Sequence, residues 1–202
     1  MAMSVRNFLV ANIFDLPFYF GLSILALTLG VQILKPLLLK KWSPKVFVVV
    51  LGLFGLYLFQ VSLLQYHAFL SGLLSPLIAS GQSLDWFFGY VRLHFWDQYL
   101  FSLIAALLFY LAAKYFNDKK GERFFEREEV WLGMLGIFLV GYPGLFFYIA
   151  LMLLLPALLS VAFLQKNERL PLYYFWLPTA VFVILIVHFV LVNQAWWVKF
   201  IF

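Results

Sequence analysis

The densest group of charged side chains in this sequence lies between positions 122 and 129. It contains four carboxylates and two guanidinium groups: Glu122, Arg123, Glu126, Arg127, Glu128 and Glu129. An apolar segment follows directly. Carboxylates in such a place can act as acid and base in an active site at the rim of a membrane, with their pKa values set apart by their surroundings. They can also form the solvated end of a membrane helix, where Glu128 and Glu129 would face the positive end of the helix dipole.

The composition indicates that these charges stand at the edge of a membrane-embedded chain. Of 202 residues, 65% are hydrophobic, 21% are aromatic and only 11% are charged, and the mean hydropathy is +0.98. A soluble domain of this size could not cover its surface with so few charges. We therefore expect residues 1–202 to form one integral membrane domain in a lipid bilayer. The net charge of +5 then reports orientation in the membrane rather than a nucleic-acid partner.

Several apolar segments are candidates for membrane helices, which need roughly 17 to 25 residues to cross the bilayer. They cover about residues 16–39, 46–65, 99–116, 130–142, 145–164 and 171–192. The predicted fold class is all-α, a polytopic bundle of about six transmembrane helices. A basic turn at 40–45 is expected to separate the first two, and Gly52 and Gly55 are expected to let a neighbouring helix approach. The aromatic-rich segment 67–98 is expected to form an interfacial or re-entrant insert.

Basic residues are concentrated in alternate connections between these segments, and this pattern predicts orientation. The segments 35–45, 117–129 and 165–170 hold most of the Lys and Arg residues of the chain. Connections rich in Lys and Arg stay on the cytoplasmic side of a membrane. We therefore expect these three segments in the cytoplasm and both termini outside, in a prokaryotic cytoplasmic membrane.

Two motifs in the second half of the chain carry a family resemblance. The first is Glu126-Arg-Glu-Glu-Val-Trp-Leu132, followed by Gly133, Gly136 and Gly141, and the second is Leu170-Pro-Leu-Tyr-Tyr-Phe-Trp176. In order and placement they resemble the catalytic loop, the glycine-spaced apolar segment and the last-helix motif of the type IV prepilin and preflagellin peptidases. Those proteins are the GxGD aspartyl peptidases of membranes. The resemblance covers about residues 35–185 and implies a site for leader peptides at the cytoplasmic face.

The resemblance places the second catalytic aspartate of the family at Glu128 or Glu129, and the first at Lys40 or Lys41. Neither glycine of the Gly-x-Gly motif is present. Aspartyl peptidases need two carboxylates that share a proton, whereas a lysine beside a glutamate keeps that glutamate ionised. The resemblance therefore implies a catalytically degenerate relative that binds or positions pilin-like leader peptides. If cleavage survives, Glu128 or Glu129 carries one acid role. The alternative is a non-enzymatic structural or transport membrane protein of unknown ligand.

Two further patterns point elsewhere. Glu128 and Glu129 also match the start of the Glu-Glu-x-x-x-Arg motif of the CAAX-protease family, but Gly133 stands where that motif needs Arg. His188 lies inside the last apolar segment, and we expect a neutral imidazole bonded to a backbone carbonyl of a neighbouring helix. His67 and His94 are expected outside, too far away to share a metal with it. The chain has no cysteine, so thiolate sites are excluded, and no metal or cofactor is predicted.

Overall fold

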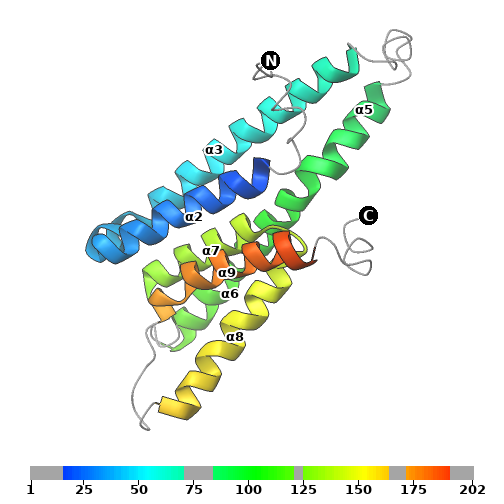
Figure 1. The fold of residues 1–202 in the computed structure, drawn as a ribbon. Coiled ribbons are helices and arrows are strands. Elements are labelled where there is room, and N and C mark those ends of the chain that lie inside the picture. The colour runs from blue at the N-terminus through cyan, green and yellow to red at the C-terminus, as the bar shows by residue number, and fades with distance from the viewer. Residues whose placement is uncertain (1–15, 71–83, 121–124, 164–171, 192–202) are drawn as a thin grey trace.

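The computed structural model describes residues 16–70, 84–120, 125–163 and 172–191 (Figure 1). These residues form helices and no strand, which confirms the all-α fold class. The α-helices are α2 (Leu16–Leu34), α3 (Pro36–Leu70), α5 (Leu84–Val91), α6 (Asp97–Lys120), α7 (Arg127–Val140), α8 (Gly144–Phe163) and α9 (Trp176–Ile186). Two π-helical turns, η1 (Arg92–Trp96) and η3 (Val187–Leu191), and one 3-10 turn, η2 (Leu172–Tyr174), complete the described elements.

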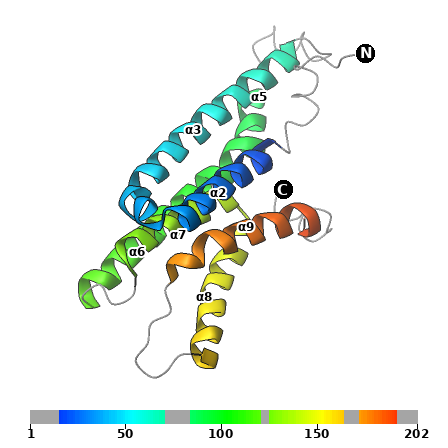
Figure 2. The ribbon, with the colours of Figure 1, turned by 60° about the vertical axis from the view of Figure 1, so that its left-hand side comes forward.

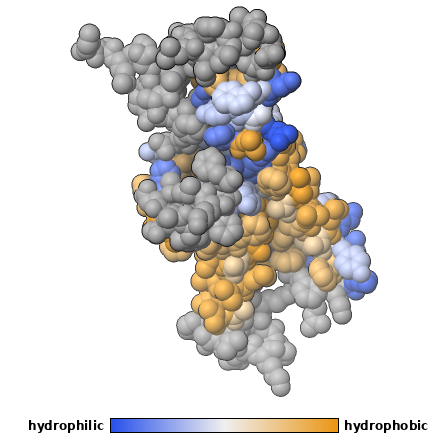
Figure 3. Space-filling model, turned by 90° about the vertical axis from the view of Figure 1, so that its right-hand side faces the viewer, coloured by the Kyte–Doolittle hydropathy of each residue, from blue (hydrophilic) through white to orange (hydrophobic). Residues whose placement is uncertain are grey.

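Among the described residues, four helical stretches are long and apolar enough to cross a membrane. They are Pro17–Leu34, Pro36–His67, Leu84–Lys119 and Leu172–Leu191. Large hydrophobic side chains such as Leu27, Val48, Leu108 and Phe182 are exposed along them. Figure 3 shows hydrophobic residues over a broad part of the described surface on one face. Such a surface suits lipid rather than water, so the chain is a helical membrane protein.

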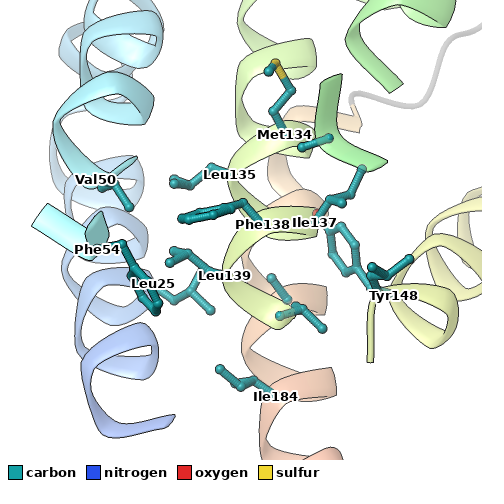
Figure 4. Close-up of a cluster of buried hydrophobic side chains, with 14 of the residues drawn as sticks. Leu25, Val50, Phe54, Met134, Leu135, Ile137, Phe138, Leu139, Tyr148 and Ile184 are labelled. Carbon is teal, nitrogen blue, oxygen red and sulfur yellow. The ribbon is translucent and has the colours of Figure 1, made fainter. Parts of the chain in front are cut away.

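Helix α7 lies at the centre of the bundle. Its 14 residues span about 21 Å, less than the roughly 30 Å of a hydrocarbon core. All residues from 129 to 140 except Trp131 are buried. Figure 4 shows Leu135 and Phe138 directed toward α2 and α3, with Tyr148 of α8 on the other side. The sequence predicts a membrane helix at 130–142, but the helix begins earlier, at Arg127, and is a short core helix rather than one of the spans found among the described residues.

Helix α8 leaves the bundle at an angle to α7 and α9, as both ribbon views show (Figures 1 and 2). Buried Tyr148 and Met152 pack it against the bundle, whereas Phe146, Leu153 and Leu158 are exposed. Helix α8 is therefore packed against the bundle on one side, and its other side presents apolar side chains that suit lipid. The apolar segment predicted at 145–164 is therefore confirmed as a helix over its described part.

The first two helices meet at Lys35, not at the basic turn 40–45 that the sequence predicts. Helix α3 already begins at Pro36, and the fixed φ of proline suits the first position of a helix. The residue before a proline is disfavoured in the helical conformation, so the break falls at Lys35. The prediction was wrong because the proline that separates the helices is Pro36 rather than Pro44.

Pro44 lies inside α3 without ending it. A proline has no N–H, so the carbonyl of Lys40, four residues earlier, loses its usual helical donor. Ser43 Oγ donates to that carbonyl at 3.2 Å instead. The basic residues of the 40–45 segment therefore stand on the first turns of α3, where they can face other helices.

The segment 84–96 is the first part of a long helix. The sequence predicts a span that begins at residue 99 behind a separate insert, but the helical stretch Leu84–Lys119 is continuous. Arg92 and Asp97, which lower the hydropathy there, form an ion pair of 3.4 Å and so offset each other's charge. Trp96 Nε1 also donates to Ser62 Oγ of α3 at 3.0 Å. Residues 71–83 of the expected insert lie outside the described residues, and its relation to the membrane surface stays a prediction.

Two glycines allow neighbouring helices to approach α7 closely. A Cβ atom on Gly136 would lie 2.5 Å from Tyr148 Cζ, and one on Gly133 would lie 2.7 Å from Phe109 Cε1. Tyr148 is fully buried, and its hydroxyl donates to the carbonyl of Trp176 at 3.1 Å. It therefore cannot move aside without losing that bond.

The glycines of α3 behave differently from the prediction. A Cβ atom on Gly52 or Gly55 would meet nothing within 4 Å among the described residues. The close helix approach predicted at this pair is therefore wrong within the described bundle. Close packing occurs on α7 because that helix is surrounded, whereas this face of α3 points outward.

Gly136→Ala should destabilise the protein. Overpacking against Tyr148 costs about 1–3 kcal/mol, which exceeds the roughly 1 kcal/mol that alanine gains over glycine in a helix. Thermal unfolding of the detergent-solubilised protein measures the effect as a lower Tm. Gly30→Ala is the matched control, because a Cβ there has no neighbour within 4 Å, and its Tm should be unchanged or higher. A Gly136→Ala protein that melts no lower than wild type would contradict the packing of α7.

Candidate functional site

A group of charged side chains closes one end of the bundle. The Lys40 ammonium lies 3.0 Å from Glu126 Oε2 and 2.8 Å from Glu128 Oε1, and 4.9 Å from the centre of the Tyr173 ring. The side chain of Glu128 is 18% exposed and that of Glu126 is 53% exposed. The group is therefore enclosed on one side and open on the other. We call Lys40, Glu126, Glu128, Glu129 and Tyr173 the rim cluster.

The first turn of α7 positions the three glutamates. Glu126 is the extended N-cap residue, and its N–H donates to Glu129 Oε2 at 2.9 Å. A glutamate at the third helical position that reaches back to the N-cap N–H fixes where the helix begins. Adjacent helical residues point about 100° apart. Glu129 therefore faces inward while Glu128 faces Lys40.

Glu129 is a structural residue. It is 4% exposed, and its Oε1 accepts the N–H of Tyr173 at 2.8 Å. Burial raises the pKa of its carboxyl above the ordinary value, although the N–H donors of Glu126 and Tyr173 act in the opposite direction. Both oxygens are used by backbone donors. Of the two glutamates that the sequence could not separate, Glu128 is the one that faces Lys40.

Tyr173 of η2 forms hydrogen bonds to residues of three helices, α2, α3 and α7. Its N–H donates to Glu129 of α7, and its carbonyl accepts a hydrogen bond of 2.5 Å from Gln32 Nε2 of α2. Its hydroxyl donates to the carbonyl of Pro36, the first residue of α3, at 3.2 Å. These bonds hold η2 against the ends of three helices and enclose the inner side of the rim cluster.

The electrostatics of the cluster keep Glu128 ionised. Burial by itself raises the pKa of Glu128. The hydrogen bond from Lys40, the hydrogen bonds with the Glu128 N–H and with Glu126, and the charge of Lys40 together leave the pKa below its ordinary value. Glu126 and Glu128 bind the same ammonium, whose positive charge reduces the repulsion between the two carboxylates. Two carboxylates and one ammonium leave this part of the cluster with a net negative charge.

Only one of the two lysines matched to the first aspartate belongs to this site. Lys40 reaches the glutamates, whereas Lys41 is exposed and forms no ion pair within the described part of the chain. The geometry therefore pairs Lys40 with Glu128. Adjacent residues on α3 point in different directions, and the sequence alone could not choose between them.

Sequence reasoning did not select Glu126, Tyr173 or Gln32 as site residues. The spacing Glu126-x-x-Glu129 is a capping signal that could have located the start of α7. No local signal predicts the bond between Gln32 and Tyr173, because 141 positions separate the two residues. Their contact depends on the tertiary arrangement of α2 and η2.

His188 and His94 line a cavity of about 200 Å³ at the C-terminal end of α7, together with Gln98 and Tyr99. Each histidine lies on a π-helical turn, a feature that is frequent at functional sites. His188 stacks on Phe18 with ring centres 3.7 Å apart.

These two histidines thus line one cavity, and the expectation that they lie too far apart to share a metal stays a prediction. In the described residues His188 contacts the rings of Phe18, Tyr19 and Phe189, and its predicted bond to a backbone carbonyl stays a prediction. No three His, Cys, Asp or Glu residues of the described chain are grouped to hold a metal ion.

No protein-family model, no curated protein and no solved structure matches this chain. Function is therefore inferred from the rim cluster and from the chemistry of its residues.

Glu129→Leu should destabilise the protein more than Glu128→Leu. Without the Glu129 carboxylate, the N–H groups of Tyr173 and Glu126 lose their acceptor, at about 1–3 kcal/mol for each buried group. Glu128→Leu removes a partly exposed ion pair that contributes about 1 kcal/mol or less. Thermal unfolding followed by tryptophan fluorescence compares the two variants. Equal decreases in Tm would show that Glu129 has no special structural role.

Proposed function

We propose that this chain is a prepilin-peptidase-like membrane protein that binds type IV pilin-like leader peptides without cleaving them. One observation carries the proposal. Lys40 and Glu128, which the sequence resemblance matches to the two catalytic aspartates, lie 2.8 Å apart. Two positions far apart in the chain thus meet at one end of the bundle, as the layout of that family requires.

The same pair supports the loss of peptidase chemistry. An aspartyl peptidase activates water between two carboxylates, one of them protonated. Here Lys40 occupies the place of one carboxylate and keeps Glu128 ionised. Glu126 offers a second carboxylate, but it binds the same ammonium. We therefore propose a pseudoenzyme rather than an active endopeptidase.

The rim cluster has features that suit a basic peptide segment. Its exposed side carries the carboxylates of Glu126 and Glu128 against the single ammonium of Lys40, so its net charge is negative. Glu126 is more than half exposed, which leaves room for a second cation. A Lys or Arg side chain of a peptide would form charge-assisted hydrogen bonds there.

We propose that the rim cluster faces the cytoplasm of a prokaryotic cell. The described parts of the basic segments 35–45 and 117–129 lie at the same end of the bundle, because Lys40 contacts Glu126 and Glu128. Lys and Arg concentrated at one end favour the cytoplasmic side. Both termini would then lie outside.

A second candidate, a non-enzymatic transport or structural protein, is favoured by the cavity at the other end of the bundle. His94 and His188 line it from two π-helical turns, and neither belongs to the rim cluster. Under this candidate His94→Ala and His188→Ala alter function while the rim variants do not. Leader-peptide binding distinguishes the two candidates.

The direct test is the binding of a fluorescent pilin-type leader peptide to membrane vesicles from a bacterial host that expresses the full chain. Inverted vesicles, which expose the cytoplasmic face, should bind the peptide, and mass spectrometry should recover it uncut. Glu126→Gln with Glu128→Gln should weaken binding by about tenfold or more, because hydrogen bonds between charged groups contribute about 1.5–3 kcal/mol.

Asp85→Asn is the control, since it removes one carboxylate at the start of α5, distant from the rim cluster. Its binding should equal that of wild type. Absence of binding to vesicles of either orientation would overturn the proposed function. Binding to right-side-out vesicles alone would overturn the orientation. Cleavage by wild type that Glu128→Gln abolishes would show an active peptidase.

A further inference from the structure

A polar groove lies beside the rim cluster, between α3, α6 and α7. Its volume is about 550 Å³, within the roughly 300–1,000 Å³ range of small-molecule sites. Its lining includes Lys114, Asn117 and Asp118 from α6, Arg127 and Trp131 from α7, and Pro44 from α3. None of these residues belongs to the rim cluster.

The groove carries two cations and one carboxylate. Lys114, Arg127 and Asp118 are all exposed, and in the described part of the chain none of them forms an ion pair. The planar donors of an arginine beside a lysine ammonium match the oxygens of a phosphate. Asp118 can only accept hydrogen bonds when ionised. The site therefore suits a ligand with a phosphate and a separate hydrogen-bond donor.

Hydrogen bonds hold two walls of this groove together. Asn117 Nδ2 donates to the carbonyl of Phe125 at 2.8 Å, and the N–H of Phe125 donates to Asn117 Oδ1 at 3.2 Å. This pair fixes the end of α6 against the residue that leads into α7. Lys114 and Arg127 therefore project from connected elements, and the groove is formed before any ligand arrives.

The groove lies at the end of an apolar helix, where the lipid headgroups of a membrane are expected. Lys114 and Asp118 lie in the last turns of the apolar stretch Leu84–Lys119. Tyr110 and Trp131 line the groove with ring centres 5.4 Å apart, and such rings gather at the membrane–water interface. Basic pockets between membrane helices bind lipid headgroups.

We propose that this groove binds a membrane phospholipid whose headgroup carries a hydrogen-bond donor beyond its phosphate. Lys114 and Arg127 bind the phosphate oxygens, and Asp118 accepts the donor. Phosphatidylethanolamine supplies an ammonium and phosphatidylglycerol supplies hydroxyls. Phosphatidylcholine ends in a quaternary ammonium without a donor, so it leaves Asp118 unpaired. The proposal does not depend on leader-peptide binding.

The test counts the lipids that the full-length protein retains. Wild type is reconstituted in equal amounts of dioleoyl phosphatidylethanolamine, phosphatidylglycerol and phosphatidylcholine, extracted in mild detergent and examined by native mass spectrometry. Phosphatidylethanolamine and phosphatidylglycerol should be retained over phosphatidylcholine. Lys114→Gln and Arg127→Gln should each reduce retention by about fivefold. Asp118→Ala should abolish the preference for phosphatidylethanolamine over phosphatidylcholine, which have the same net charge.

Lys119→Gln is the matched control, because it removes an exposed ammonium from the same helix outside the groove, and its retention should equal that of wild type. Equal retention of all three lipids by wild type would overturn the proposal without any variant. A loss in Lys119→Gln as large as that in Lys114→Gln would overturn it in favour of general charge attraction. Retention of inorganic phosphate by a wild-type protein that retains none of the three lipids would overturn the lipid as occupant.

Discussion

The backbone N–H of Tyr173 donates a hydrogen bond of 2.8 Å to the buried carboxylate of Glu129, and the arrangement of the rim depends on this bond. A carboxylate among apolar helices is costly unless its oxygens are hydrogen-bonded, and both oxygens here accept backbone N–H groups. The bond holds η2 against α7. From there the carbonyl and hydroxyl of Tyr173 reach Gln32 and Pro36, so one buried glutamate joins the ends of α2, α3 and α7.

The two neighbouring glutamates of α7 consequently have different roles. Both oxygens of Glu129 accept hydrogen bonds from backbone N–H groups. Glu128 and the N-cap Glu126 instead face Lys40 at the open side of the cluster. The Lys40 ammonium offsets only one of these two negative charges. What remains is an exposed, net negative surface at the end of an apolar bundle. This chemistry is better suited to holding a cationic segment than to cutting a peptide bond.

Composition and apolar length were sufficient to predict a helical membrane bundle. The contact candidates came from the family resemblance, which left Lys40 or Lys41 and Glu128 or Glu129 open. Composition and apolar length did not predict the break at Lys35, because Pro36 and Pro44 both indicate a helix boundary in the sequence. The hydrogen bond from Ser43 to the Lys40 carbonyl, which shows that Pro44 lies inside a helix, is visible only in the structure. The hydropathy pattern also placed residues 84–96 outside the helix that contains α6. A hydropathy value counts Arg92 and Asp97 as two separate charges and does not show that they form an ion pair. Contacts such as Gln32 with Tyr173 depend on tertiary structure alone.

The most direct test of this account is a charge-reversal cycle at the contact between α3 and α7. Lys40→Glu, Glu128→Lys and the double variant are compared by thermal unfolding in the same detergent. Lys40→Glu places three carboxylates together and should lower the Tm, and adding Glu128→Lys should restore part of the loss. We predict a coupling of about 1 kcal/mol, typical of a partly exposed pair. Strictly additive effects of the two substitutions would show that Lys40 and Glu128 do not meet, and would contradict the account.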